Sequence, residues 1–195
     1  QNLHDLSQWM VYNRSQQDLK GEIRMKRQLF LIGGASGSGK TAICRALAGK
    51  IKGVICLDGD TLWHPQVFNM ENTKPFYDLW FKLADEIASN NVAVAIFHAG
   101  LGLPDNLTEY AKDIFEIHYL TLYCSEIKLE ERLRNRLEWK NAGSKAAGFI
   151  NAMKGMNFKY KALPADINVD TSDISLEESS LQVKNWIIST INDRE

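Results

Sequence analysis

The chain has 195 residues, of which 45% are hydrophobic and 24% are charged, and its formal net charge is −1 at pH 7. This length suits one domain with a single large core, and the composition is that of a globular protein rather than a disordered one. Because the net charge is close to zero, we expect neither nucleic acid nor an anionic membrane as the main partner.

Three cysteines, Cys44, Cys56 and Cys124, lie far apart in the sequence and form no C-x-x-C pair. Each falls in a predicted buried element, which favours small core residues in a reducing compartment over a metal site. No apolar run approaches the roughly 18 residues that a membrane-spanning helix needs, and no secretory leader precedes the first predicted strand. We therefore expect a cytoplasmic protein.

Residues 1–24 have two interpretations. Leu3, Leu6 and Met10 recur at helical spacing, which is typical of a short amphipathic helix packed on the domain. Met25, however, stands just before the first predicted strand, where a domain that carries an extension would begin. The sequence thus predicts an N-terminal extension or accessory helix over 1–24 and one domain over 25–195.

A glycine-rich segment matches the phosphate-loop pattern G-x-x-x-x-G-K-[ST]. A buried strand over 29–32 precedes it and an amphipathic helix over 41–50 follows it, which is the setting that this pattern requires. Such a loop binds phosphates through backbone N–H groups at a helix N-terminus, while its lysine bridges the β- and γ-phosphates and its hydroxyl binds Mg²⁺. The predicted nucleotide-binding residues are Gly34, Ala35, Ser36, Gly37, Ser38, Gly39, Lys40, Thr41 and, in the first helical turn, Ala42.

Apolar strands alternate with helical patterns along the rest of the chain. Further strands are predicted at 54–57, 92–97, 115–123 and 166–170, and helices at 76–89, 104–112, 125–138 and 176–191. This alternation indicates an α/β fold with a parallel sheet covered on both faces. In such sheets, ligands bind beyond the carboxyl ends of the strands. We therefore expect the phosphate loop, the Asp58–Asp60 turn and His98 to converge on one crevice.

Two carboxylates, Asp58 and Asp60, follow the second strand at the same edge of the sheet as Lys40. Phosphoryl transfer needs ligands for the metal's coordination sphere and a residue that orients the attacking hydroxyl. We expect Asp60 to act on the acceptor and Asp58 to lie near metal-bound water. The alternative is an Asp-Gly turn with a helix N-cap, since these residues also mark strand ends for structural reasons.

The phosphate loop followed by Leu57-Asp58-Gly59-Asp60 resembles the small-molecule P-loop kinases: gluconate, shikimate and adenylylsulfate kinases and the nucleoside and nucleotide kinases. The stretch from Asp60 to Pro65 is most similar to gluconate kinase, where a G-D…H-P stretch enters the acceptor site. By element order the resemblance spans most of residues 28–190. It implies a three-layer P-loop NTPase fold, with a five-stranded parallel sheet in the order 2-3-1-4-5, helices on both faces, a helical lid, and ATP·Mg²⁺ as the donor.

Three further residues are candidates for acceptor binding. Trp63 and His64 adjoin Asp60 and begin an aromatic-rich stretch, whose other rings are as well explained by packing into the core. His98 ends the third strand, where many P-loop proteins carry a metal-associated Asp. It either hydrogen-bonds the acceptor or satisfies a turn. The missing acidic residue and following Arg argue against a simple nucleoside-monophosphate kinase.

Two arginines, Arg132 and Arg136, are four residues apart on one face of a predicted helix. Such a pair is mildly destabilising unless an anion binds between its members, although pairing with Glu130 and Glu131 is an alternative. The resemblance implies that Arg132 stacks on adenine and that Arg136 contacts phosphates. It also places Asp170-Thr171-Ser172, after the fifth strand, near the adenine ring, with Asp170 as the candidate binding residue.

A lysine-rich, glycine-punctuated segment follows this helix. No acidic residue occurs from Trp139 to Ala165. We predict a lid over about 139–162 that closes over the donor phosphates and excludes water, which would otherwise compete with the acceptor hydroxyl. A basic surface loop is the alternative.

Together these features predict an ATP-dependent phosphotransferase that moves the γ-phosphoryl group to a hydroxyl of a small molecule, such as a sugar acid or nucleoside. Lys40, Asp60 and Arg136 are the predicted catalytic residues. Within this class, an aminocyclitol- or antibiotic-modifying kinase and a toxin-like sugar-nucleotide kinase are alternatives on the same fold. The alternative is an ATPase or regulatory switch without such an acceptor, although no N-K-x-D element is present. Whether the protein is a monomer or a homodimer is left open.

Overall fold

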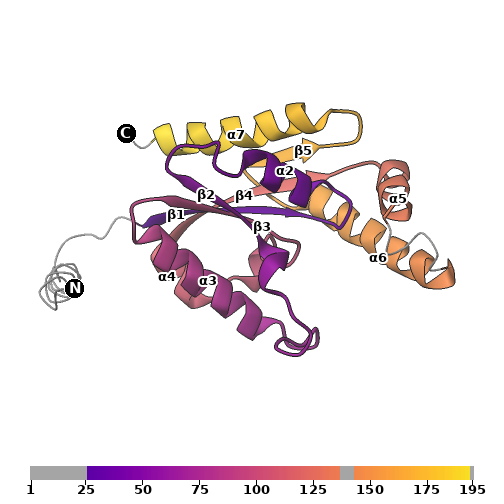
Figure 1. The fold of residues 1–195 in the computed structure, drawn as a ribbon, viewed down its shortest axis with the longest axis horizontal. Coiled ribbons are helices and arrows are strands. Elements are labelled where there is room, and N and C mark those ends of the chain that lie inside the picture. Colours follow the sequence, from indigo (N-terminus) through magenta and orange to yellow (C-terminus); the bar gives the residue numbers. More distant parts are fainter. Residues whose placement is uncertain (1–25, 137–142, 194–195) are drawn as a thin grey trace, which may run out of the picture.

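Five parallel strands form one central sheet in the computed structural model, which describes residues 26–136 and 143–193 (Figure 1). The strand order is β2-β3-β1-β4-β5, so the predicted order 2-3-1-4-5 is confirmed. The predicted N-terminal extension or accessory helix, 1–24, lies outside the described residues. The strands are β1 (Arg27–Gly34), β2 (Val54–Asp58), β3 (Ala93–Phe97), β4 (Phe115–Tyr123) and β5 (Ile167–Asp170).

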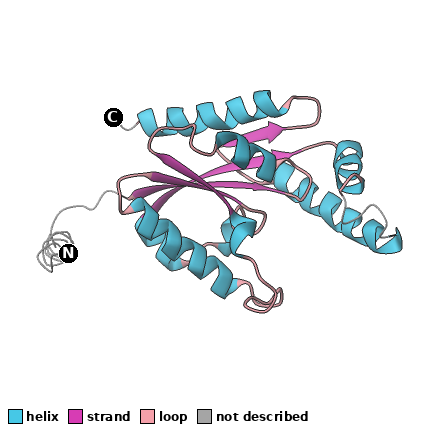
Figure 2. Cartoon of the chain, in the orientation of Figure 1, coloured by secondary structure: helices cyan, strands magenta, loops and turns pink. Residues whose placement is uncertain are grey.

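Helices cover both faces of the sheet (Figure 2). They are α2 (Lys40–Leu47), α3 (Lys74–Ala88), α4 (Glu109–Ile114), α5 (Glu126–Arg134), α6 (Gly143–Ala162) and α7 (Leu176–Asn192). Figure 1 shows α2 and α7 on one face, α3 and α4 on the other, and α5 beyond the carboxyl ends of the strands. Within the described residues, no helix is long and apolar enough to cross a membrane.

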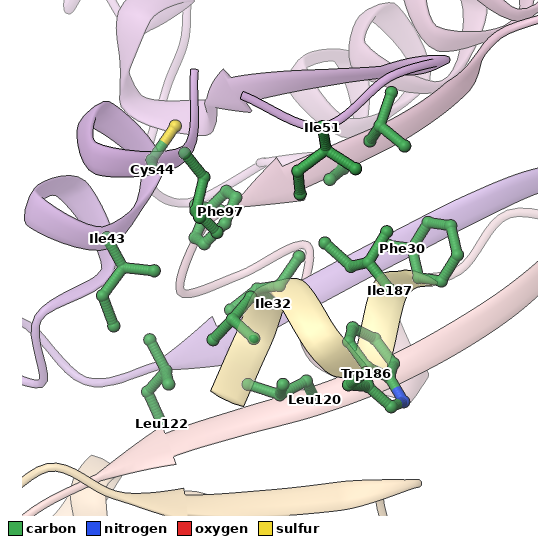
Figure 3. Packing of buried hydrophobic residues seen from close by; sticks show 14 of the residues in the cluster. Phe30, Ile32, Ile43, Cys44, Ile51, Phe97, Leu120, Leu122, Trp186 and Ile187 are labelled. Atoms are coloured by element: carbon green, nitrogen blue, oxygen red, sulfur yellow. The ribbon is translucent and has the colours of Figure 1, made fainter. Parts of the chain in front are cut away.

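Side-chain alternation along β1 produces a core on each face of the sheet. Phe30 and Ile32 pack with α2 and α7, in the cluster that Figure 3 shows around Ile43 and Ile187. Leu29 and Leu31 point to the opposite face, in a second cluster that α3 dominates. All four β1 side chains are fully buried. Successive residues of a strand face opposite sides, so this central strand is held from both layers and its end, where the phosphate loop begins, is fixed.

Two predicted helices differ from the observed ones. The segment 104–112 is a 3₁₀ turn (Pro104–Asn106) followed by α4, because Thr108 is extended and its hydroxyl accepts a hydrogen bond from Ala111 N, which starts a new helix. The helix predicted over 125–138 ends at Arg134, where the last turn tightens and Arg136 N donates to Leu133 O.

Most of the predicted lid is helix α6, and its C-terminal half is anchored to the sheet. The buried side chain of Asn157 donates to Cys124 O at 2.7 Å and accepts from Cys124 N at 3.1 Å, which closes the end of β4. Tyr160 is fully buried and its hydroxyl donates to Ala99 O. Its ring lies against β1, since a Cβ on Gly33 would approach Tyr160 Cε1 to 2.5 Å. Residues 139–142 of the predicted lid lie outside the described residues, and closure over the donor stays a prediction.

We predict that Asn157→Leu lowers the free energy of unfolding by about 2–3 kcal/mol, because it leaves a buried N–H and a buried C=O of Cys124 without partners. Urea denaturation measures this difference. The control is Asn151→Leu, the same substitution at an exposed position of α6, which should change stability by less than about 0.5 kcal/mol. Equal effects of the two substitutions would contradict the anchoring role.

Candidate active site

The predicted phosphate loop connects β1 to α2. Gly37 (φ 94°) and Gly39 (φ 106°) adopt positive φ angles that residues with a Cβ rarely adopt. Gly39 is the N-cap of α2, and its carbonyl accepts the first helical hydrogen bond, from Ile43 N. The loop thus ends at a helix N-terminus, which is the local geometry that binds phosphate.

Lys40, the first residue of α2, folds back onto this loop. Its Nζ donates to Gly34 O at 2.8 Å and to Ala35 O at 3.0 Å, and the residue is only 8% exposed. Burial lowers the pKa of Lys40 to about 8, against the opposing effect of the Asp60 charge. Phosphate oxygens can replace the two carbonyls as partners for the ammonium group.

This pKa predicts that ATP binding is linked to proton uptake. Above about pH 8 the empty site holds largely neutral Lys40, and phosphate anions favour its charged form, so binding raises its pKa and takes up a proton. ATP affinity should therefore fall as the pH rises through 8. Calorimetry in two buffers with different ionisation enthalpies measures the uptake.

The control for this prediction is Lys40→Met. Proton uptake by the wild type should exceed that of the variant by a fraction of a proton near pH 8.5 and by almost nothing near pH 7. A difference that is the same at both pH values would show that another group takes up the proton.

A cleft of about 440 Å³ opens beside the phosphate loop. Several residues predicted for nucleotide binding and catalysis line it: Ser36, Gly37, Gly39, Lys40, Thr41, Ala42, Asp60, Arg132 and Arg136. Thr171, in the segment that the resemblance placed near adenine, also lines it, and so do residues that were not predicted: Ile43, Arg45, Ile174, Leu176 and Ser179. The structure thus brings the phosphate loop, one carboxylate and both arginines together, and one wall of the cleft comes from the β5–α7 connection and the start of α7.

Arg132 is fixed by three hydrogen bonds. Its guanidinium donates to Gly37 O at 3.2 Å, to Thr171 Oγ1 at 2.9 Å and to Thr171 O at 2.6 Å. Thr171 is 3% exposed, and its hydroxyl lies 3.0 Å from Ser38 O and 3.1 Å from Tyr123 O. Arg132 and Thr171 therefore clamp the phosphate loop to the ends of β4 and β5. Stacking of Arg132 on adenine stays a prediction.

Arg136 lies beyond the end of α5 and is exposed. It donates to the Ser36 hydroxyl at 2.9 Å. Its charge contributes to the lowered pKa values of both Lys40 and Asp60, which places it near both groups. Because α5 ends at Arg134, Arg132 and Arg136 do not share a helix face as predicted; they contact different parts of the loop.

The two carboxylates after β2 have different surroundings. Asp58 caps a 3₁₀ turn (Gly59–Leu62), with Oδ1 3.2 Å from Asp60 N, as the capping interpretation predicted. The Asp60 side chain is 68% exposed and has Oδ1 3.3 Å from His98 Nε2. Hydrogen bonding from His98 lowers the pKa of Asp60, partial burial opposes this, and the charges of Lys40 and Arg136 lower it further. The Asp60 carboxylate is therefore ionised at neutral pH.

The remaining predicted residues lie outside the lining of the cleft. Trp63 is half-buried, with its ring centroid 5.9 Å from that of Phe68 and 5.2 Å from that of Phe76. His64 is exposed and its Nδ1 accepts from Gln66 N at 3.3 Å. Asp170 is exposed, and its carboxylate accepts from Ser172 N. Binding of acceptor or adenine by Trp63, His64 and Asp170 stays a prediction.

Comparison with protein-family models finds a match to the family described as Zeta toxin over residues 7–116, which include the phosphate loop, Asp60 and His98. Comparison with curated proteins finds no match.

Solved structures of similar fold include kinases from three bacteria. A sugar kinase from Janibacter sp. HTCC2649 has 16% identity and a TM-score of 0.58, with 83% of this chain and 94% of that chain covered. A gluconokinase from Sinorhizobium meliloti 1021 has 16% identity, a TM-score of 0.55 and coverage of 88% and 99%. Shikimate kinase from Bacteroides thetaiotaomicron has 17% identity, a TM-score of 0.55 and coverage of 82% and 98%. The fold is that of the P-loop kinases, as the resemblance implied.

Proposed function

This chain belongs to the zeta toxin family, and from that membership we propose that it is an ATP-dependent kinase that transfers the γ-phosphoryl group to a hydroxyl of a small molecule. One observation carries the proposal: Lys40 of the phosphate loop and the Asp60 carboxylate line the same cleft. A donor site for phosphates and a group that can receive a hydroxyl proton are the two parts that such a transfer needs. The names of the similar solved structures, a sugar kinase, a gluconokinase and a shikimate kinase, support a small-molecule acceptor.

The residues of the cleft also fit a bound magnesium ion. Mg²⁺ at nucleotide sites usually takes one or two protein ligands and completes its shell with phosphate oxygens and water. The described residues contain no group of three or more His, Cys, Asp or Glu that could hold a metal alone. Thr41 would hold the ion through its hydroxyl, with Asp58 near a bound water. When bound, the ion neutralises charge on the β- and γ-phosphates.

In the proposed reaction the protein orients the reacting groups and stabilises the negative charge of the phosphates. The loop N–H groups and Lys40 hold the β- and γ-phosphates, and Arg136 exchanges its bond to Ser36 for the transferring group. Asp60 orients the acceptor hydroxyl and receives its proton as the new O–P bond forms and the bond from the γ-phosphorus to the bridging oxygen breaks, which releases ADP. The transition state is loose, so a positioned carboxylate suffices and a strong base is unnecessary.

An ADP-release assay tests this function. The protein is mixed with ATP, Mg²⁺ and a panel of sugar acids, nucleosides, sugar nucleotides and aminoglycosides. We expect one class to stimulate ADP release, and Lys40→Met to abolish that release. The exposed Lys52→Met is a matched control, since Lys52 lies outside the cleft. ATP binding without stimulation by any acceptor would instead favour the ATPase or switch alternative.

A further inference from the structure

We propose that His98 is a positioning residue that holds the Asp60 carboxylate in place for the acceptor hydroxyl. This inference rests on the proposed kinase function. From the sequence, His98 was expected either to bind the acceptor or only to satisfy a turn. We infer instead that it acts on the reaction by orienting Asp60.

The hydrogen bonds of His98 define which ring nitrogen carries the proton. Nδ1 accepts from Gly100 N and from Leu101 N, each at 2.9 Å. A nitrogen that accepts two N–H groups cannot itself be protonated, so the proton of the neutral ring is on Nε2. Nε2 is the atom that lies 3.3 Å from Asp60 Oδ1. The turn after β3 therefore fixes the tautomer that can donate to Asp60. The distance is slightly longer than that of a typical N–H···O hydrogen bond, and such contacts often tighten when substrate binds.

The ring of His98 is also held by packing. A Cβ on Gly59, the residue between the two carboxylates, would lie 2.5 Å from His98 Cβ, so a glycine is needed for the two segments to meet. On another side the ring centroid lies 5.3 Å from that of Phe76 and 6.3 Å from that of Tyr77. The His98 side chain is 12% exposed, whereas that of Asp60 is 68% exposed. A nearly buried, well-supported donor thus restricts a carboxylate that solvent would otherwise leave free to rotate.

Two substitutions separate the two functions of the ring. In His98→Asn the amide oxygen can accept the N–H groups of the turn at the Nδ1 position, but the side chain is too short to reach Asp60. In His98→Gln the amide nitrogen can donate from the Nε2 position, but the acceptor at Nδ1 is lost. If positioning of Asp60 matters, His98→Gln should be the more active variant although it damages the turn.

The kinetic test uses ATP, Mg²⁺ and the acceptor that stimulates ADP release. For His98→Asn we expect kcat to fall about 10- to 100-fold with the KM for ATP within about threefold, and His98→Gln to recover most of the loss. Gly59→Ala should lower kcat similarly with His98 present, because the added Cβ displaces the ring. Thermal melting of each variant, with His118→Gln as a distant histidine control, reports folding. Wild-type kcat in His98→Asn, or equal losses in the Asn and Gln variants, would overturn the proposal.

A spectroscopic test needs no acceptor. Long-range nitrogen-15 spectra of histidine-labelled protein identify the tautomer of each ring, and His98→Asn assigns the His98 signals. We expect protonated Nε2 and unprotonated Nδ1, with an Nε2–H resonance that moves in Asp60→Asn. A protonated Nδ1, or an unmoved resonance, would overturn the positioning role. If the spectra are as expected but no acceptor stimulates ADP release, the kinase function fails while the His98–Asp60 contact stands.

Discussion

Asp60→Asn should reduce kcat for phosphoryl transfer by about 10²–10⁴-fold, the range typical of general acid–base groups, and should leave ATP affinity within about threefold of the wild type. Asparagine has the shape of aspartate and can still contact His98, but its amide cannot receive the hydroxyl proton. The carbonyls of Gly34 and Ala35 hold Lys40, and Asp60 accepts none of its hydrogen bonds, so the substitution should not disturb the phosphate positions. Steady-state kinetics with the identified acceptor and calorimetric ATP binding measure the two quantities.

Asp58→Asn is the matched control, because it makes the same chemical change two residues away. Asparagine accepts an N-cap hydrogen bond about as well as aspartate, so the bond from Asp60 N should persist. If Asp58 is only a cap, kcat should change by less than about threefold; if it lies near metal-bound water, the Mg²⁺ concentration for half-maximal activity should rise. A large loss of ATP affinity in Asp60→Asn would place Asp60 on the donor side and contradict its role toward the acceptor.

The fold could be predicted from local patterns because β1, β2 and β3 each contain an uninterrupted apolar run, at 29–32, 54–57 and 93–97. The sheet order followed from the resemblance, and the strands have that order in the structure. Helix α6 was less visible, because one of its buried positions is Asn157, a polar residue. Only contact with the Cys124 backbone makes that burial favourable, and this contact joins segments 33 residues apart in sequence.

In the candidate site, as in the fold, local motifs could be predicted from the sequence and contacts between distant segments could not. The phosphate loop is a local motif, so its residues could be named from the sequence. The clamp between Arg132 and Thr171 and the contact between His98 and Asp60 join separate elements, and sequence reasoning reached only the expectation that His98 and Asp60 would converge at one sheet edge. Thr171 was missed as a clamp because its role depends on the loop carbonyl of Ser38, which carries no side-chain signal.

Three arginines of the α5 region should respond differently to the same substitution by lysine. Arg136 is exposed and donates to the half-buried Ser36 hydroxyl, so it can move onto a phosphoryl group; Arg132 is already held by three hydrogen bonds to the protein. We expect Arg136→Lys to lower kcat by about 10²–10³-fold with a small change in ATP affinity, since lysine cannot reproduce bidentate contacts to transferring oxygens. Arg132→Lys should instead weaken ATP binding by about tenfold, because the clamp on the loop loosens.

The control is Arg134→Lys, at an exposed arginine between the two that pairs with Glu130 at 2.7 Å on the helix surface. Such a pair contributes little, so kcat and ATP affinity should both stay within about twofold of the wild type. If Arg136→Lys weakened ATP binding as much as it lowered kcat, Arg136 would bind the ground-state nucleotide, because an interaction made only in the transition state changes kcat without changing affinity. The three variants thus separate a group that stabilises the transferring phosphoryl from one that shapes the loop beneath it.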